Sequence, residues 1–145
     1  MKLALLVLAA AGALAVARAD EPAFNIIETR QAGQDLLSGT FTGINQGIAH
    51  QVPVKAFASP AAAMARWMKQ FPTTFPAGSD QGHNTKALPA IWSDRAGFDQ
   101  AAANFIAAAE KLSQLAKAED TDGFTAQAKT LGGTCTACHN KYRAK

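Results

Sequence analysis

Two cysteines and a histidine close to the end of the sequence are the side chains with the clearest chemical potential. They are Cys135, Cys138 and His139, in the run Cys-Thr-Ala-Cys-His. Thiols three residues apart can each add across one vinyl group of a haem, and the adjacent imidazole can then bind the iron from one face. The run therefore predicts one covalently attached haem c, with His139 as a ligand of the iron.

Two other uses of these cysteines are open from the residue types alone. Cys135 and Cys138 are the only cysteines of the chain, so they could form a redox dithiol or contribute to a zinc site. Zinc usually takes four ligands in tetrahedral geometry, whereas His50 and His83 are isolated in the sequence and no second Cys/His cluster exists. Haem attachment is the favoured interpretation.

Residues 1–19 have the composition of an export signal. Lys2 supplies the positive start, an apolar stretch follows, and Ala17-Arg18-Ala19 fits the small-x-small cleavage rule. The apolar stretch is shorter than the ~20 residues needed to cross a bilayer. We expect a cleaved signal peptide at 1–19 and a single mature domain at 20–145 with no membrane span. Export and covalent haem together predict the periplasm of a Gram-negative bacterium.

The charge balance argues against nucleic acid as a partner. Without Lys2 and Arg18, 12 basic side chains stand against 11 acidic ones, and they form no basic cluster. Proteins that bind the phosphate backbone carry a basic surplus on one face. The mature chain lacks that surplus.

The apolar residues recur at helical spacing, and Val and Ile are sparse after the signal, so we expect an all-α fold. The first helix is expected over 22–50, with Arg30 and Gln34 as polar interruptions of its apolar stripe. The second is expected over 59–71, with Ser59 as N-cap and Pro60 at the first helical position. A long loop over 72–88 follows.

The third helix is expected to begin near Ser93 or Asp94, and the fourth near Thr121 or Asp122. Four amphipathic helices with mostly short links predict an up-down-up-down four-helix bundle, with the covalently bound haem held between facing helices. In this topology the end of the fourth helix lies beside the start of the first. The haem pocket is then predicted to draw on Arg30, Gln34, Leu37, Trp67, Met68, Phe71, Trp92 and Phe98. For each apolar member of this set, simple packing in the core is the favoured alternative.

Three segments together resemble a class II c-type cytochrome, most closely cytochrome c′. They are Cys135–Arg143, Ile27–Gly33 and Ile91–Asp94, and the resemblance covers essentially the whole mature chain. It implies a four-helix bundle, often a homodimer through the first two helices. It also implies a largely high-spin haem with His139 on one face of the iron, binding nitric oxide and carbon monoxide on the other.

The chain departs from the family pattern at Gln34. The family typically places Leu, Phe, Tyr or Met at this position, over the open face of the haem, and its relatives with Met there are six-coordinate electron carriers. The amide of Gln34 can donate to a bound gas or water, or it can turn aside to a backbone group. Met68 is the one internal rival for the open iron position.

Two arginines complete the predicted cofactor site. Arg30 lies on a stripe that should be apolar, where a buried charge needs a partner, and a haem propionate is the natural counter-ion. The alternative for Arg30 is an ordinary surface position. Arg143 follows His139 by four residues and, as the matching basic residue does in the family, can place a positive charge near the iron ligand. A solvated C-terminal arginine is the alternative.

The favoured function is a gas-binding haem protein that is not an enzyme, with a periplasmic electron carrier and a weak haem enzyme as alternatives. The electron carrier would require redox partner proteins. Peroxidase chemistry needs general acid–base help beside the iron, and the first helix offers no His and Arg pair for it. The resemblance and the length of the first helix imply a homodimer. The outer face of this helix, which carries Ala32, Leu36 and Thr40, would form the contact, and a simple solvent-exposed face is the alternative.

Overall fold

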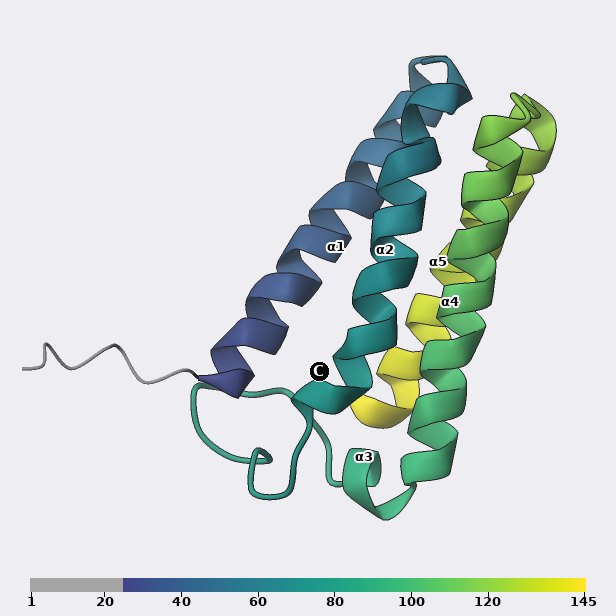
Figure 1. Ribbon diagram of the computed structural model, residues 1–145. Helices are drawn as coiled ribbons and strands as arrows, with labels where there is room; N and C mark the ends of the chain where they lie inside the picture. Colours follow the sequence, from purple (N-terminus) through teal and green to yellow (C-terminus); the bar gives the residue numbers. More distant parts are fainter. Residues whose placement is uncertain (1–24) are drawn as a thin grey trace, which may run out of the picture.

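The computed structural model describes residues 25–145, and in this range the chain is helical (Figure 1). The long helices are α1 (Ile26–Ala49), α2 (Ala58–Gln70), α4 (Arg95–Lys117) and α5 (Thr121–Tyr142). Short 3₁₀ helices cover Val54–Phe57 and Phe71–Thr74, and a single turn, α3, covers Ala90–Ser93. The predicted signal peptide lies outside the described residues. None of the helices in 25–145 is long and apolar enough to cross a membrane.

The four long helices alternate in direction along the bundle (Figure 1). Helix α4 packs most extensively, against α2 on one side and α5 on the other, whereas α1 makes few contacts and leans away toward its N-terminal end. The predicted all-α, up-down-up-down four-helix bundle is confirmed.

Local capping explains where three of the long helices begin. The side chain of Asn25 accepts from the backbone N–H groups of Ile27 and Glu28 at 3.0 and 3.2 Å. Asp94 and Asp120 cap α4 and α5 in the same way. Each cap satisfies N–H groups that have no partner inside the helix. The expected start near Asp94 is confirmed, and α5 begins at Thr121 as expected.

The expected start of α2 is wrong. The helix begins at Ala58, and Ser59 is its second residue and makes no capping hydrogen bond. The preceding 3₁₀ turn buries Val54 and runs directly into α2, so the chain needs no capping residue there. Pro60 is tolerated because it still lies in the first turn, where its missing N–H breaks no helical bond.

The hydrophobic core lies along α4 and continues into α5. Helix α4 has a continuous buried stripe, and Phe124 and Leu131 of α5 are fully buried against it. The stripe consists of Phe98, Ala102, Phe105, Ala109, Leu112 and Ala116. At the lower end of the bundle the ring of Phe98 lies 5.0 Å from that of Phe75 and 5.3 Å from that of Tyr142. Rings at these separations add to the apolar burial.

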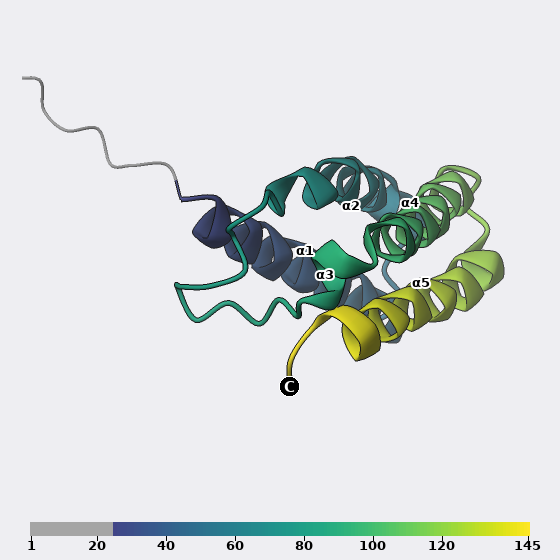
Figure 2. The same cartoon turned by 90° about the horizontal axis from the view of Figure 1, so that it is seen from below.

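Residues 75–89, which we call the strap, cross the lower end of the bundle between α1 and the end of α5 (Figure 2). The backbone N–H of Leu88 donates to the carbonyl of Tyr142 at 3.0 Å, and that of Ala144 donates to Lys86 at 2.8 Å. Gly78 and Gly82 both have positive φ, which glycine adopts without steric cost. Apart from the 3₁₀ turn Phe71–Thr74, the predicted loop over 72–88 is confirmed.

Candidate cofactor-binding site

A cavity of about 660 Å³ lies at the strap end of the bundle, with walls from α1, α2, α4, α5 and the strap. This is the size range of ordinary small-molecule and cofactor pockets. Both cysteines and His139 line it from α5. Six of the eight residues predicted for the pocket line it as well: Arg30, Gln34, Leu37, Met68, Phe71 and Phe98.

The other two predicted residues, Trp67 and Trp92, do not line the cavity. The indole of Trp67 lies against the backbone of α1 at Gly33, where a Cβ atom would collide with it. The indole N–H of Trp92 donates to the carbonyl of Pro76 at 3.1 Å. Successive residues of a helix point about 100° apart, so Met68 faces the cavity while the neighbouring Trp67 packs elsewhere.

Cys135 and Cys138 lie one turn apart on α5, half-buried and packed against the core. Burial raises the pKa of both thiols, and the neighbouring Cys135 raises that of Cys138 further. A reactive dithiol usually has a lowered thiol pKa, so the redox interpretation gains no support. Within residues 25–145 no three His, Cys, Asp or Glu side chains gather as a metal site, so zinc gains none either.

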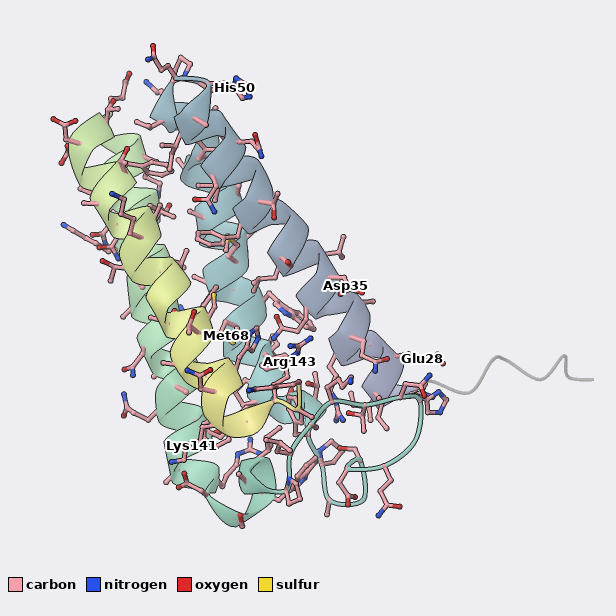
Figure 3. The ribbon with its side chains drawn as sticks, turned by 180° about the vertical axis from the view of Figure 1, so that it is seen from behind. Glu28, Asp35, His50, Met68, Lys141 and Arg143 are labelled. Carbon is pink, nitrogen blue, oxygen red and sulfur yellow. The ribbon has the colours of Figure 1, made fainter. Side chains whose placement is uncertain are left out.

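His139 is the only one of the three histidines that lines the cavity. The residue is exposed, but partial desolvation at the cavity wall lowers its pKa, and the charge of Arg143 lowers it further, which favours the neutral imidazole that binds metals. His50 lies at the opposite end of the bundle from Met68 and Arg143 (Figure 3). His83 lies in the strap, where its Nδ1 is 2.9 Å from a carboxylate oxygen of Glu28.

Arg30 is 3% exposed and holds the strap with its guanidinium. It donates to the carbonyls of Thr74 and Ser79 at 3.0 and 2.6 Å, and to the hydroxyls of Ser79 and Thr85, both at 2.9 Å. The group also lies 4.2 Å from the ring centre of Phe75. Burial lowers the pKa of Arg30, and no carboxylate in the described range forms an ion pair with it.

These contacts bear on how Arg30 could meet a haem propionate. A guanidinium has five N–H donors, and four hydrogen bonds to the strap and to Thr74 already use the two Nη groups. A bidentate propionate at the Nη groups would have to displace some of these bonds. The pairing therefore stays a prediction, and the ordinary surface position is wrong because the side chain is buried.

Gln34 lies on the α1 wall of the cavity and is half-buried. Its amide makes no hydrogen bond to any residue in 25–145, whereas the neighbouring Gln31 donates to the carbonyl of His83 at 3.0 Å. The α1 wall therefore presents one uncommitted, partly buried amide to the cavity.

The sequence did not indicate a role for Tyr142 or for the strap wall. Tyr142 lines the cavity, is buried, and its hydroxyl donates to a carboxylate oxygen of Asp94 at 2.9 Å. Lys141 pairs with the same oxygen at 2.6 Å. Arg143, which is exposed, and Lys86 also line the cavity, next to the short backbone pairing between the strap and the C-terminal tail. Only the placement of Tyr142 on the apolar stripe of α5 could have signalled its burial.

The family model described as Cytochrome C′ matches residues 25–143. The chain belongs to this family. Cytochrome c′ from Rubrivivax gelatinosus is 36% identical over 82% of this chain and 94% of its own length. That from Rhodospirillum rubrum is 33% identical, over 94% and 93%.

Solved cytochrome c′ structures have the same fold. The crystal structure from Rubrivivax gelatinosus superposes with a TM-score of 0.73 over 81% of this chain and 94% of that one, at 36% identity. A nitric oxide complex of a cytochrome c prime mutant from Alcaligenes xylosoxidans gives 0.74 over 83% and 94%, at 29% identity. A carbon monoxide-bound variant of that protein matches equally well.

Cytochrome c′ proteins carry one covalently bound haem c, so the predicted cofactor is confirmed. The residues in this cavity fit that group. Two unpaired thiols and an imidazole lie on one wall. The rest of the lining combines many aromatic and aliphatic side chains with polar ones, among them Arg30, Gln34 and Arg143. When bound, the haem would supply the iron at which small ligands attach.

Proposed function

We propose that this protein is a periplasmic haem protein whose iron is bound by His139 and stays mainly five-coordinate. It binds small gases, nitric oxide and carbon monoxide, on the side of Gln34, and it is not an enzyme. Cys135 and Cys138 attach the haem, and Arg30, Gln34 and Arg143 surround it. Trapping of nitric oxide is the use that this chemistry fits.

The main support for the proposal is the set of side chains on the α1 wall, which includes no strong ligand for iron. The cavity has one histidine, on α5, and the facing helix α1 contains no histidine, methionine or cysteine. Those are the side chains that ligate haem iron most often. An amide is a poor ligand for iron, so the face toward α1 is left open for an external ligand. The gas complexes of the protein from Alcaligenes xylosoxidans support the same use of the site.

A six-coordinate electron carrier is the second candidate, and Met68 is the observation that favours it. Its side chain is 7% exposed and lines the cavity from α2. A methionine sulfur on the iron would make the haem low-spin and raise its reduction potential. The protein would then serve redox partner proteins.

Absorption and EPR spectra of the ferric protein separate the two candidates. We expect high-spin spectra, and we expect the ferrous protein to bind carbon monoxide and nitric oxide without displacing a protein ligand. A low-spin spectrum that becomes high-spin in Met68→Ala would instead identify the electron carrier. Met64→Ala is the matched control, because Met64 is buried one turn away on α2 and does not line the cavity.

The attachment residues and the location are tested by mass spectrometry of periplasmic protein made together with the haem-attachment machinery. We expect a chain beginning at Asp20 with one haem added, and loss of most holoprotein in Cys138→Ala. A full-length chain in the cytoplasm, or an unmodified mature mass, would contradict the proposal.

We also propose a homodimer through the outer face of α1. Leu36 on this face is 74% exposed, while Ala32 is exposed and Thr40 half-buried. Light scattering at high micromolar concentration should give twice the chain mass, and Leu36→Lys should give the single mass. A monomer in the unaltered protein would refute the dimer and leave the haem site unaffected.

A further inference from the structure

We propose that Gln34 determines which gases the haem prefers. Its amide N–H group donates a hydrogen bond to the outer atom of an iron-bound ligand. Ligands that gain negative charge on binding, such as nitric oxide, are therefore favoured over carbon monoxide. This inference rests on the proposed function, because it requires the open iron face to lie toward α1.

The first argument comes from the hydrogen bonds of the polar side chains on the α1 wall, because only a side chain without a partner can donate freely to a bound gas. The Nη groups of Arg30 are engaged by Thr74 and the strap, and the amide nitrogen of Gln31 donates to the carbonyl of His83 at 3.0 Å. Asp35 also lines the cavity, but an ionised carboxylate only accepts hydrogen bonds. Ser38 also lines the cavity, but it is exposed, so Gln34 is the partly buried donor on this wall that has no partner among residues 25–145.

The second argument is the position of Gln34 along the helix. It lies four residues after Arg30 and three before Leu37, and all three line the cavity. Residues three or four apart share one face of a helix. Gln34 is therefore on the cavity face between a buried cation held by the strap and a buried apolar side chain.

The third argument is the opposite wall, which is apolar. Met68, Phe71 and Phe98 line the cavity and are almost fully buried. A hydrogen bond is stronger in such surroundings than in water, because the local dielectric is low. An amide donor that faces this apolar part of the lining therefore stabilises a ligand's charge more than it would in water.

The discrimination follows from the charge on the ligand's outer atom. Hydrogen bonds to a charged acceptor are roughly twice as strong as those to a neutral one. Iron-bound carbon monoxide carries little charge on its oxygen, whereas ferrous iron transfers more electron density to bound nitric oxide. The amide thus stabilises bound nitric oxide more, and a hydrocarbon at position 34 would remove the difference.

The test compares Gln34→Leu and Gln34→Glu with the unaltered haem-loaded protein. Gln34→Glu keeps the size of the side chain and, ionised in alkaline buffer, removes the donor. Gln34→Leu removes every polar atom. The matched controls are Gln46→Leu and Gln46→Glu, since Gln46 is an exposed glutamine of the same helix that does not line the cavity.

Two quantities are measured: the infrared stretching frequency of iron-bound carbon monoxide, and the ratio of nitric oxide to carbon monoxide affinity. A donor lowers the frequency, so we expect it to rise in both Gln34 variants and to stay constant in both controls. The affinity ratio should fall by roughly 2- to 10-fold, the equivalent of one hydrogen bond. Gln34→Glu distinguishes loss of the donor from a change in size, because it removes the donor at nearly constant side-chain size.

An unchanged frequency or an unchanged ratio in both Gln34 variants, with both gases still bound, would overturn the role of Gln34 and leave the proposed function standing. Failure of the unaltered ferrous protein to bind either gas would instead overturn the proposed function. Haem attachment in each variant is checked by its absorption spectrum, so that loss of the cofactor is not mistaken for loss of the hydrogen bond.

Discussion

Helices α1 and α4 have nearly the same length, 24 and 23 residues, but very different surroundings. Helix α4 packs between α2 and α5 and buries a continuous apolar stripe, whereas α1 buries only five residues, one of them an arginine. The difference arises because α1 faces the cavity for much of its length. Helix α4 therefore builds the fold, and α1 is free to carry the polar side chains that set the chemistry of the site.

The largest loss of stability should come from truncating a core residue of α4. Phe98 is 2% exposed and contacts the rings of Phe75 and Tyr142. Phe98→Ala should lower the free energy of unfolding of the haem-loaded protein by about 3–5 kcal/mol, measured by denaturant titration. Thr42→Ala, at an exposed position of α1 away from the proposed dimer face, should change it by no more than about 0.5 kcal/mol. Equal losses would refute the division between the two helices.

Arg30 is the exception on α1, because its loss should matter for stability. Arg30→Met keeps a long side chain but leaves the carbonyls of Thr74 and Ser79 without their donors, at a cost on the order of 2 kcal/mol. Faster amide hydrogen exchange in the strap should accompany the loss. Arg30→Lys, which keeps the charge without the fork of donors, should lie in between. Unaltered exchange in the strap would show that Arg30 does not hold it.

Two glycines of α1 should respond with opposite signs to the same substitution. A Cβ at position 33 would collide with the indole of Trp67, so Gly33→Ala should destabilise by about 1–3 kcal/mol. A Cβ at position 43 meets nothing within 4 Å, so Gly43→Ala should stabilise by about 0.5–1 kcal/mol through helix propensity. Thermal unfolding of both variants measures the two changes in stability. The same sign in both would place Trp67 away from α1.

The smallest effect should be on how the free energy of unfolding depends on pH, through Asp94 at the start of α4. Hydrogen bonds from Lys141 and then Tyr142 lower the pKa of Asp94. The ionised form of Asp94 is thus favoured in the folded state. Its contribution to stability is fully present above the ordinary carboxyl pKa of about 4, and it is lost as the pH falls through the lower pKa of the folded protein. Asp94→Asn, which can still cap the helix, should flatten the unfolding free energy over this acid range. An unchanged acid slope would exclude Asp94 as its source.

The helical bundle, the cofactor and the cavity position of the thiols were all predictable from the sequence. Apolar spacing and N-caps such as Asp94 are local properties, so α4 and α5 begin where the sequence indicates. Cys135, Cys138 and His139 lie within five residues, and their spacing on one helix carries their chemistry without any distant partner. Four helices with mostly short links then leave little choice of topology.

Contacts between distant segments were decided only by the tertiary structure. Arg30 finds its acceptors in Thr74, Ser79 and Thr85, which lie in or beside the irregular strap, and no helical period encodes a loop's path. The placement of Trp67 against Gly33 rather than in the cavity depends equally on how α1 leans. Periodicity assigns a residue to a face of its helix, but the neighbour that covers that face depends on the packing of the whole bundle.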